Sequence, residues 1–195
     1  MENLEITVKV DYTLNELLNY LTTNKFRFHQ SFRCIDIFMI KKEDKDNLNS
    51  YEDMNKCLII RELLLKEKVI RQVLKKEKQF DKEGRIIKNV QTATIINNVP
   101  NKRKELEQQG YIELMRMDDY CYTFSKNNHE FIIEYVAPIG TFIEFEDRNF
   151  YSNLRNGESI EELIELFDTF RIKYDKNDYF IKKSWLLYNK IKSSQ

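Results

Sequence analysis

Two glutamates, Glu144 and Glu146, stand two residues apart in the otherwise apolar stretch GTFIEFE, residues 140–146. Because side chains alternate between the two faces of a β-strand, this spacing places both carboxylates on one face of a strand, while Ile143 and Phe145 take the other. Two carboxylates side by side repel one another, so such a face needs a cation between them or basic side chains opposite. Carboxylate oxygens are also ligands that Mg²⁺ and Mn²⁺ prefer. The stretch therefore indicates a site for a metal ion or for basic side chains.

Charged residues also interrupt other apolar, strand-like runs of the chain. They are Glu5 and Lys9, Asp36, Arg61, Lys75 and Lys76, and Arg116. An ordinary antiparallel sheet with one solvated face explains any single strand of this kind. If the sheet instead closes into a barrel, these side chains gather in its interior, with acidic residues from the first and last strands and basic residues from the middle ones. Lysine and arginine match phosphate oxygens, so a metal-bound polyphosphate suits such an interior.

The hydrophobic pattern predicts the elements that position these residues. Residues 4–11 alternate as a strand, and Thr13 with Glu16 has the spacing of a capping box that opens a helix ending near Asn24. The other predicted elements are about four strands between residues 26 and 98, a short helix within 100–111, strands at 111–117, 119–126 and 129–146, and helices after Ser159 and over 182–191. Since few of them alternate as β-α-β, we expect an α+β fold, namely a single-domain closed antiparallel β-barrel, or tunnel, of about eight strands with helices packed outside.

The composition favours one domain, residues 1–195, because 195 residues with 42% hydrophobic content suffice for one core. Lysine and arginine together number 32, as do aspartate and glutamate, which argues against the positive field of a nucleic-acid-binding protein. We find no apolar run long enough to span a membrane and no signal-like N-terminus, and the three cysteines form no metal-binding pattern. A cytoplasmic location without membrane contact is therefore expected, and the oligomeric state is left open.

Several segments, in chain order, resemble the CYTH superfamily, the triphosphate tunnel metalloenzymes that include class IV adenylate cyclases, thiamine triphosphatases and tripolyphosphatases. EITVK (residues 5–9) is similar to the E-x-E-x-K signature that opens the family, and IGTFIEFE (139–146) to its L-G-x-F-x-E-x-E strand. Further similarities are those of CIDIFMI to the D-x-Y strand, CLIIRE to the L-R-I-R-E strand, KKEKQFDKEG to the lysine strand and its turn, and KKSWLL to the terminal K-S-Y helix. The resemblance spans nearly the whole chain and rests on the order of these motifs.

The resemblance implies a set of functional residues. In that family a tunnel holds a triphosphate between basic side chains, while Mg²⁺ or Mn²⁺, bound by carboxylates, polarises the phosphates. Carried over by position, the metal ligands are Glu5, Glu144 and Glu146, and these residues together with Lys9 form the catalytic set. The implied phosphate-binding residues are Lys9, Arg61, Lys75, Lys76, Arg116 and Lys183, with Lys78 as a further contact.

Three departures from the family pattern leave the activity open. Thr7 stands where the second glutamate of the signature is expected, Ile59 replaces an arginine, and the strand at residues 88–94 has no carboxylate. Because a hydroxyl carries no charge, Thr7 weakens the expected metal site. The main expectation is a metal-dependent hydrolase of triphosphate compounds. The alternatives are a non-catalytic tunnel that binds a polyphosphate or nucleotide, and an adenylate cyclase of class IV type.

Overall fold

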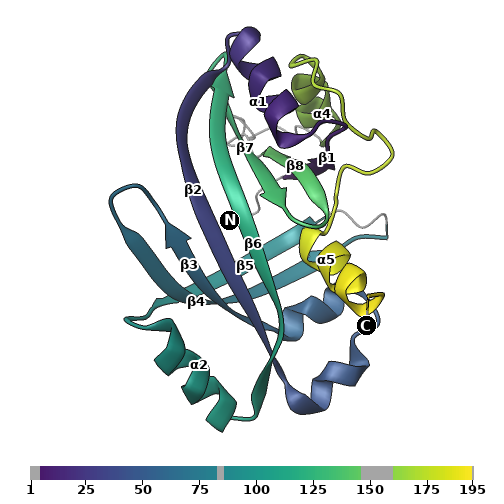
Figure 1. Ribbon diagram of the computed structural model, residues 1–195. Helices are drawn as coiled ribbons and strands as arrows, with labels where there is room; N and C mark the ends of the chain where they lie inside the picture. Colours follow the sequence, from purple (N-terminus) through teal and green to yellow (C-terminus); the bar gives the residue numbers. More distant parts are fainter. Residues whose placement is uncertain (1–4, 83–85, 146–159, 195) are drawn as a thin grey trace.

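The computed structural model describes residues 5–82, 86–145 and 160–194, and its central feature is one antiparallel sheet of eight strands (Figure 1). The strands are β1 (Ile6–Lys9), β2 (Arg27–Lys41), β3 (Leu58–Leu64), β4 (Val69–Phe80), β5 (Ile86–Ile95), β6 (Tyr111–Lys126), β7 (His129–Val136) and β8 (Gly140–Phe145). The helices of the described residues are α1 (Leu14–Thr23), α2 (Val99–Gln108), α4 (Ile160–Asp168), α5 (Lys183–Lys192) and the 3₁₀ helices η1 (Lys42–Asn47) and η2 (Tyr51–Lys56). The predicted α+β class is therefore confirmed.

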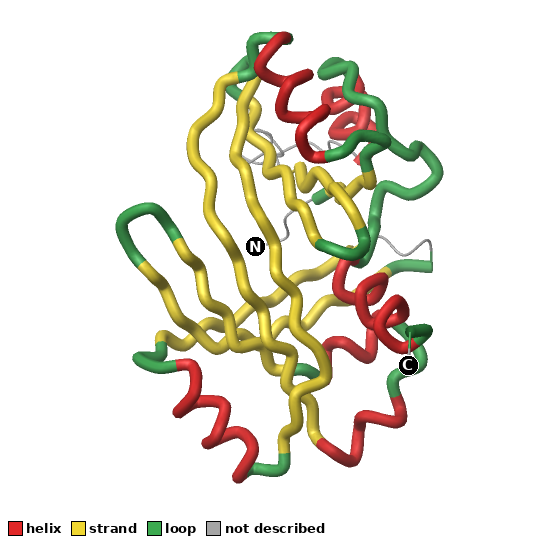
Figure 2. Tube along the Cα trace, viewed as in Figure 1, coloured by secondary structure: helices red, strands yellow, loops and turns green. Residues whose placement is uncertain are grey.

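The strands follow one another across the sheet in the order β1-β8-β7-β6-β2-β3-β4-β5. The long strands β2 and β6 pair over most of their length in the middle of the sheet (Figure 2). Strand β1 ends the order on one side and β5 ends it on the other. Among the described residues the sheet is thus open, and the predicted closure into a barrel is not found.

The C-terminal segment occupies the free edge of β1. The backbone N–H of Thr7 donates to the carbonyl oxygen of Tyr179 at 2.9 Å, and the N–H of Ile181 donates to the carbonyl oxygen of Thr7 at 3.1 Å. Thr7 therefore forms a parallel bridge around Phe180. A strand edge offers its unpaired N–H and C=O groups to whichever segment reaches it. Residues 179–181 therefore take these groups of Thr7.

Two predicted boundaries in the second half of the sheet differ from the structure. The runs at 111–117 and 119–126 form one strand, β6, because Asp118 between them continues the register with β2 without a break. The run at 129–146 divides into β7 and β8 at a turn that ends in Gly140, whose φ of +111° suits glycine alone without strain. The two changes compensate, so the sheet keeps the expected eight strands.

The outer face of the sheet, which α1 and α4 cover at one end, is apolar (Figure 1). The predicted capping box opens α1: the N–H of Thr13 donates to Glu16 Oε2 at 2.8 Å, and the N–H of Glu16 donates to Thr13 Oγ1 at 3.3 Å. The buried side chains between these helices and the sheet include Ile6, Val8, Leu17, Leu21, Phe131, Ile133, Phe145, Phe167 and Phe170. At the other end α2 covers a smaller group, Ile37, Met39, Ile60 and Leu106. The outer face is thus the main core.

The inner face of the sheet is apolar at one end and charged at its centre. At the apolar end, Leu187 of α5 packs in one cluster with Phe38, Leu74 and Phe142 from three strands. This packing fixes α5 against the inner face and brings its first residue, Lys183, to the charged centre. The charged centre is therefore covered by the strands on one side and by the start of α5 on another.

Candidate functional site

The charged centre of the inner face contains a cavity of about 260 Å³. Its charged lining consists of five carboxylates, Glu5, Asp36, Asp119, Glu134 and Glu144, and five cationic side chains, Arg61, Lys76, Lys78, Lys182 and Lys183. They come from six strands, the residue before β1 and the first turn of α5 with its N-cap. Strand alternation explains why these side chains point into one cavity. Where a strand contributes several lining residues, they stand two apart, as Lys76 and Lys78 do. The cavity is therefore balanced in charge but highly polar.

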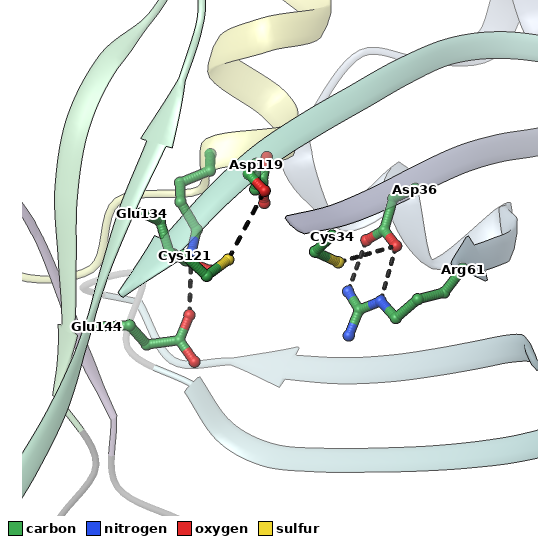
Figure 3. Close-up of polar contacts among 8 residues, drawn as sticks. Cys34, Asp36, Arg61, Asp119, Cys121, Glu134 and Glu144 are labelled. Atoms are coloured by element: carbon green, nitrogen blue, oxygen red, sulfur yellow. Dashed lines mark hydrogen bonds and ion pairs between the residues drawn. The ribbon is translucent and has the colours of Figure 1, made fainter. Parts of the chain in front are cut away.

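A buried ion pair joins two middle strands at one side of the cavity. Asp36 and Arg61 lie directly opposite each other on β2 and β3, and the guanidinium holds the carboxylate in a bidentate contact with Nε to Oδ1 at 2.7 Å and Nη2 to Oδ2 at 2.5 Å (Figure 3). Asp36 is only 1% exposed, and the thiol of Cys34 also donates to its Oδ1, at 3.6 Å. Arg61 keeps further N–H donors that are not directed at Asp36.

The thiol of Cys34 is not a nucleophile in this setting. Burial, together with the charge of Asp36, raises its pKa to about 12. Only a thiolate attacks an electrophile efficiently, and almost none is present at neutral pH. Cysteine chemistry is therefore no part of the candidate site at this position.

A second group of charges surrounds Lys183, the first residue of α5. Its ammonium forms ion pairs with Glu134 of β7 and with Glu144 of β8, the latter at 3.0 Å. Burial lowers the pKa of Lys183 to about 8, and the negative charge of Asp119 opposes this shift. Near pH 7 the side chain is therefore still mainly an ammonium, and it neutralises carboxylates from two adjacent strands.

Asp119 is a buried carboxylate of the cavity, and one of its oxygens is unsatisfied within the described ranges. It is 3% exposed, and its Oδ1 accepts no hydrogen bond there. Figure 3 shows Asp119 close to Cys121, whose thiol donates to the backbone oxygen of Asp119 at 3.9 Å. Burial raises the pKa of Asp119 to about 6, although Lys183 acts in the opposite direction. A carboxylate of this kind is available for a donor group.

Three lysines form the basic side of the cavity. Lys76 is half-buried, and no hydrogen bond or ion pair of its ammonium to a described residue is present. Burial lowers the pKa of Lys76, and the charge of Arg61 lowers it further. Lys78 follows on the same face of β4, and Lys182 lies over the rings of Phe80 and Tyr51, at 5.1 and 5.7 Å from their centroids. Positive charge thus accumulates between β4 and the start of α5.

The structure brings together six of the residues predicted from the sequence and leaves three outside. Those that line the cavity are Glu5, Arg61, Lys76, Lys78, Glu144 and Lys183. Lys9 is instead exposed beside Gly140, and Lys75 donates to the backbone oxygen of Asn55. Arg116 is exposed because its neighbour Met117 takes the inner face. Glu146 lies outside the described residues.

Four charged lining residues were not among the predicted site residues: Asp36, Asp119, Glu134 and Lys182. The alternation of side chains along a strand could have indicated Asp119. Met117, Asp119 and Cys121 stand two apart in one strand, so a continuous β6 would have directed Asp119 inward. Lys182 directly precedes the predicted Lys183. Both reach the cavity because α5 begins at Lys183, with Lys182 as its N-cap.

The described carboxylates do not by themselves form a complete Mg²⁺ or Mn²⁺ site, and Glu146, one of the expected ligands, lies outside the described residues. Among the described residues, no group of three or more His, Cys, Asp or Glu side chains is placed to hold a metal ion. Glu144 accepts a hydrogen bond from Lys183, and the hydroxyl of Thr7 donates to Glu5 Oε1 at 3.4 Å. Hard divalent cations need several oxygen ligands at once, and the ammonium of Lys183 already neutralises the carboxylate of Glu144.

Comparisons with known proteins establish the fold only. No family model matches this sequence, and neither does any curated protein. The PH1819 protein from Pyrococcus horikoshii OT3 has a similar structure, with a TM-score of 0.68 and 15% identity over 96% of this chain and 99% of that one. A "putative adenylate cyclase" from Vibrio parahaemolyticus gives a TM-score of 0.59 and 16% identity over 93% of this chain and 94% of that one.

The same fold also occurs in a protein assembly. A chain in the structure of the Schizosaccharomyces pombe Mediator head module has a TM-score of 0.53 and 8% identity, covering 87% of this chain and 92% of that one. Such different contexts mean that the fold does not decide the activity, which must be argued from the cavity. In the part of the chain that the structure describes, no helix combines the length and the apolar character that crossing a membrane requires.

Proposed function

We propose that this protein binds the phosphate chain of a small triphosphate or polyphosphate in the charged cavity. The observation that carries the proposal is Lys76, whose ammonium faces the cavity without a partner among the described residues. Burial and the neighbouring cations Arg61 and Lys78 lower the pKa of this ammonium, although Asp36 and Glu144 act in the opposite direction. A half-buried ammonium among other cations is costly unless an anion is present. A bound phosphate chain supplies that anion.

The spacing of the cations favours a chain of phosphates over a single phosphate. Lys76 and Lys78 project from the same face of β4, and two residues of strand span about 6.6 Å. The remaining N–H donors of Arg61 suit phosphate oxygens, which guanidinium groups bind in a planar, directed way. Lys182 adds a further positive charge from the start of α5. Cations on three elements can therefore contact different positions along one ligand.

Fold and sequence together support a diverged tunnel protein of the CYTH type. The motif order resembles that superfamily, and the Vibrio parahaemolyticus protein with the same fold is named after an adenylate cyclase. The open sheet still surrounds a charged cavity on several sides, because the C-terminal segment and α5 cover the gap beside β1. We therefore propose a tunnel-like rather than a closed-barrel member.

Binding without rapid turnover is favoured over hydrolysis or cyclisation. Both reactions in the resembling family use a divalent cation held by carboxylates. Here Glu144 is engaged by Lys183, and Thr7 replaces one of the expected ligands. Positioning and charge neutralisation dominate phosphoryl transfer, so a site without a well-held metal loses much of its catalytic power. The structure thus supports the binding alternative more strongly than the hydrolase.

The proposal is tested by following stability and turnover in the same samples. Purified protein is incubated with tripolyphosphate, thiamine triphosphate or ATP, each with EDTA, Mg²⁺ or Mn²⁺. The melting temperature and the release of phosphate, pyrophosphate and cyclic AMP are measured. We expect at least one ligand to raise the melting temperature in EDTA without product release. Lys76→Met should reduce this rise, whereas Lys104→Met, which removes an exposed lysine of α2, should preserve it.

Three other outcomes would contradict binding without turnover. Phosphate release that needs a divalent cation and disappears in Glu144→Ala establishes the hydrolase instead. Release of pyrophosphate with cyclic AMP establishes the cyclase. A melting temperature that responds to none of the three ligands under any condition rejects the proposed function altogether.

A further inference from the structure

Lys183 occupies an unusual position for a lysine. It is the first residue of α5, and its side chain is only 12% exposed. The start of a helix carries a partial positive charge, which disfavours a cation there. Burial disfavours the ammonium as well, because it removes water from the charge. Nothing in the local helix therefore explains a charged lysine at this position.

The carboxylates of the cavity provide the explanation. Glu134 and Glu144 lie on adjacent strands, and both form ion pairs with the Lys183 ammonium. Asp119 and Glu5 also face Lys183 closely enough to favour its charged form, whereas Lys76 is the nearby group that disfavours it. Two carboxylates thus contact the Lys183 ammonium, and two more lie close enough to favour its charge. Without a cation, so many carboxylates in one half-buried place would repel one another strongly.

We infer that Lys183 is a built-in counter-cation that takes the place of a divalent metal ion among the carboxylates of the cavity. Its role is to balance the negative charges of Glu134 and Glu144, and it is not a phosphate contact. The cavity of the wild-type protein accordingly has little affinity for Mg²⁺ or Mn²⁺, and removing the ammonium creates a divalent-cation site. This inference goes beyond the proposed function and does not depend on which anion binds near Lys76.

The test measures Mn²⁺ binding to the full-length protein in the absence of any phosphate compound. Mn²⁺ is titrated into the wild type and into Lys183→Met, and free Mn²⁺ is followed by electron paramagnetic resonance. We expect weak binding by the wild type and an affinity on the order of tenfold or more higher in Lys183→Met, since the repulsion between the ammonium and Mn²⁺ is gone. Mn²⁺ should also raise the melting temperature of this variant more than that of the wild type.

Two further variants separate a specific role from a general change of charge. Lys183→Arg keeps the positive charge and should bind Mn²⁺ as weakly as the wild type. Lys76→Met also removes one ammonium from the cavity, but Lys76 forms no ion pair with a carboxylate of the described residues, so this change should raise the Mn²⁺ affinity much less than Lys183→Met. Equal gains in Lys76→Met and Lys183→Met would overturn the inference, because net charge alone would then explain the result.

The inference remains testable if Lys183→Met does not fold. Tight Mn²⁺ binding by the wild-type protein, with a dissociation constant in the micromolar range or below, overturns it without any variant. Weak binding by the wild type, together with weak binding by Lys183→Arg, supports it. Because no phosphate ligand is present, none of these outcomes repeats the test of the proposed function.

Discussion

The outer and inner faces of the same sheet are held together by different interactions. On the outer face, aromatic rings such as Phe131 and Phe170 pack 5.5 Å apart, centroid to centroid, and are almost completely buried. On the inner face, Asp36 pairs with Arg61, and Lys183 pairs with carboxylates, while Lys76 is left without a partner in the described structure. The outer face is thus held mainly by apolar packing and the inner face by ion pairs, and under the proposed function a bound phosphate chain would balance the charge of Lys76.

The largest expected effect comes from the outer face. Phe131 is 1% exposed and contacts the rings of Phe26, Phe124 and Phe170. Phe131→Ala should lower the free energy of unfolding by about 3–5 kcal/mol, because it leaves a cavity in the core. Urea denaturation measures the change. A loss below about 1 kcal/mol, or a change of ligand affinity in protein that is still folded, would contradict the division of roles between the faces.

The next effect tests the buried ion pair of the inner face. Arg61→Met leaves the carboxylate of Asp36 buried without its partner and should cost about 3 kcal/mol of unfolding free energy. The double variant Asp36→Leu with Arg61→Met removes both charges and should recover part of that loss. Urea denaturation of the two single variants and the double variant gives the coupling energy. Additive losses would show that the pair does not contribute as a unit.

A smaller effect is expected for the unpartnered lysine. Lys76→Met should weaken binding of tripolyphosphate roughly tenfold, the value of one charge-assisted hydrogen bond. Stability should not fall at pH 7: burial lowers the pKa of Lys76, so the charged form is less favourable in the folded than in the unfolded state. Calorimetric titration and urea denaturation measure the two quantities. A clear loss of stability with unchanged affinity would assign Lys76 to the structure and not to binding.

The smallest effect concerns pH. Burial and the nearby Lys78 lower the pKa of Lys182 to about 8, while Asp178, Glu5 and Asp81 act in the opposite direction. Lys182 therefore loses its charge as the pH rises through about 8, and tripolyphosphate affinity should fall by less than about tenfold between pH 7 and pH 9. Lys182→Arg stays charged over this range and should show a flatter profile. The profiles are recorded by calorimetric titration.

The lowered pKa of Lys182 also makes the free energy of unfolding depend on pH. The pKa of Lys182 is lowered from 10.5 in the unfolded chain to about 8 in the fold, so between these values the unfolded state binds more protons. Its contribution to the free energy of unfolding therefore rises with pH across that window. A contribution that instead falls there, measured as the difference between wild type and Lys182→Arg, would contradict the burial of this ammonium.

Local signals in the sequence predicted much of the fold. The capping box of Thr13 and Glu16 and the alternation of β1 depend on neighbouring residues only, and the structure contains both. The predicted closure of the barrel is not found among the described residues, where Thr7 of β1 instead bridges to the segment around Phe180, far away in the chain. A bridge between segments so far apart in the chain leaves no local pattern in the sequence.

The sequence anticipated the position of some cavity residues and not of others. Arg61, Lys76 and Glu144, which were carried over from the family resemblance, line the cavity, and their roles there stay predictions. Arg116, also taken from the resemblance, lies outside the cavity, because the inward series of β6 contains Met117, Asp119 and Cys121. The partners of Lys183 are also invisible in the sequence, as they depend on the approach of α5 to β7 and β8.

The most direct test of the central claim is a calorimetric titration of tripolyphosphate into metal-free protein in EDTA. It compares the wild type with the double variant Lys76→Met and Lys78→Met and with the surface control Lys104→Met. We predict that the wild type and the control bind and that the double variant does not bind measurably. Absence of binding by the wild type, or equal affinity in the double variant, would contradict the assignment of the inner face to phosphate binding.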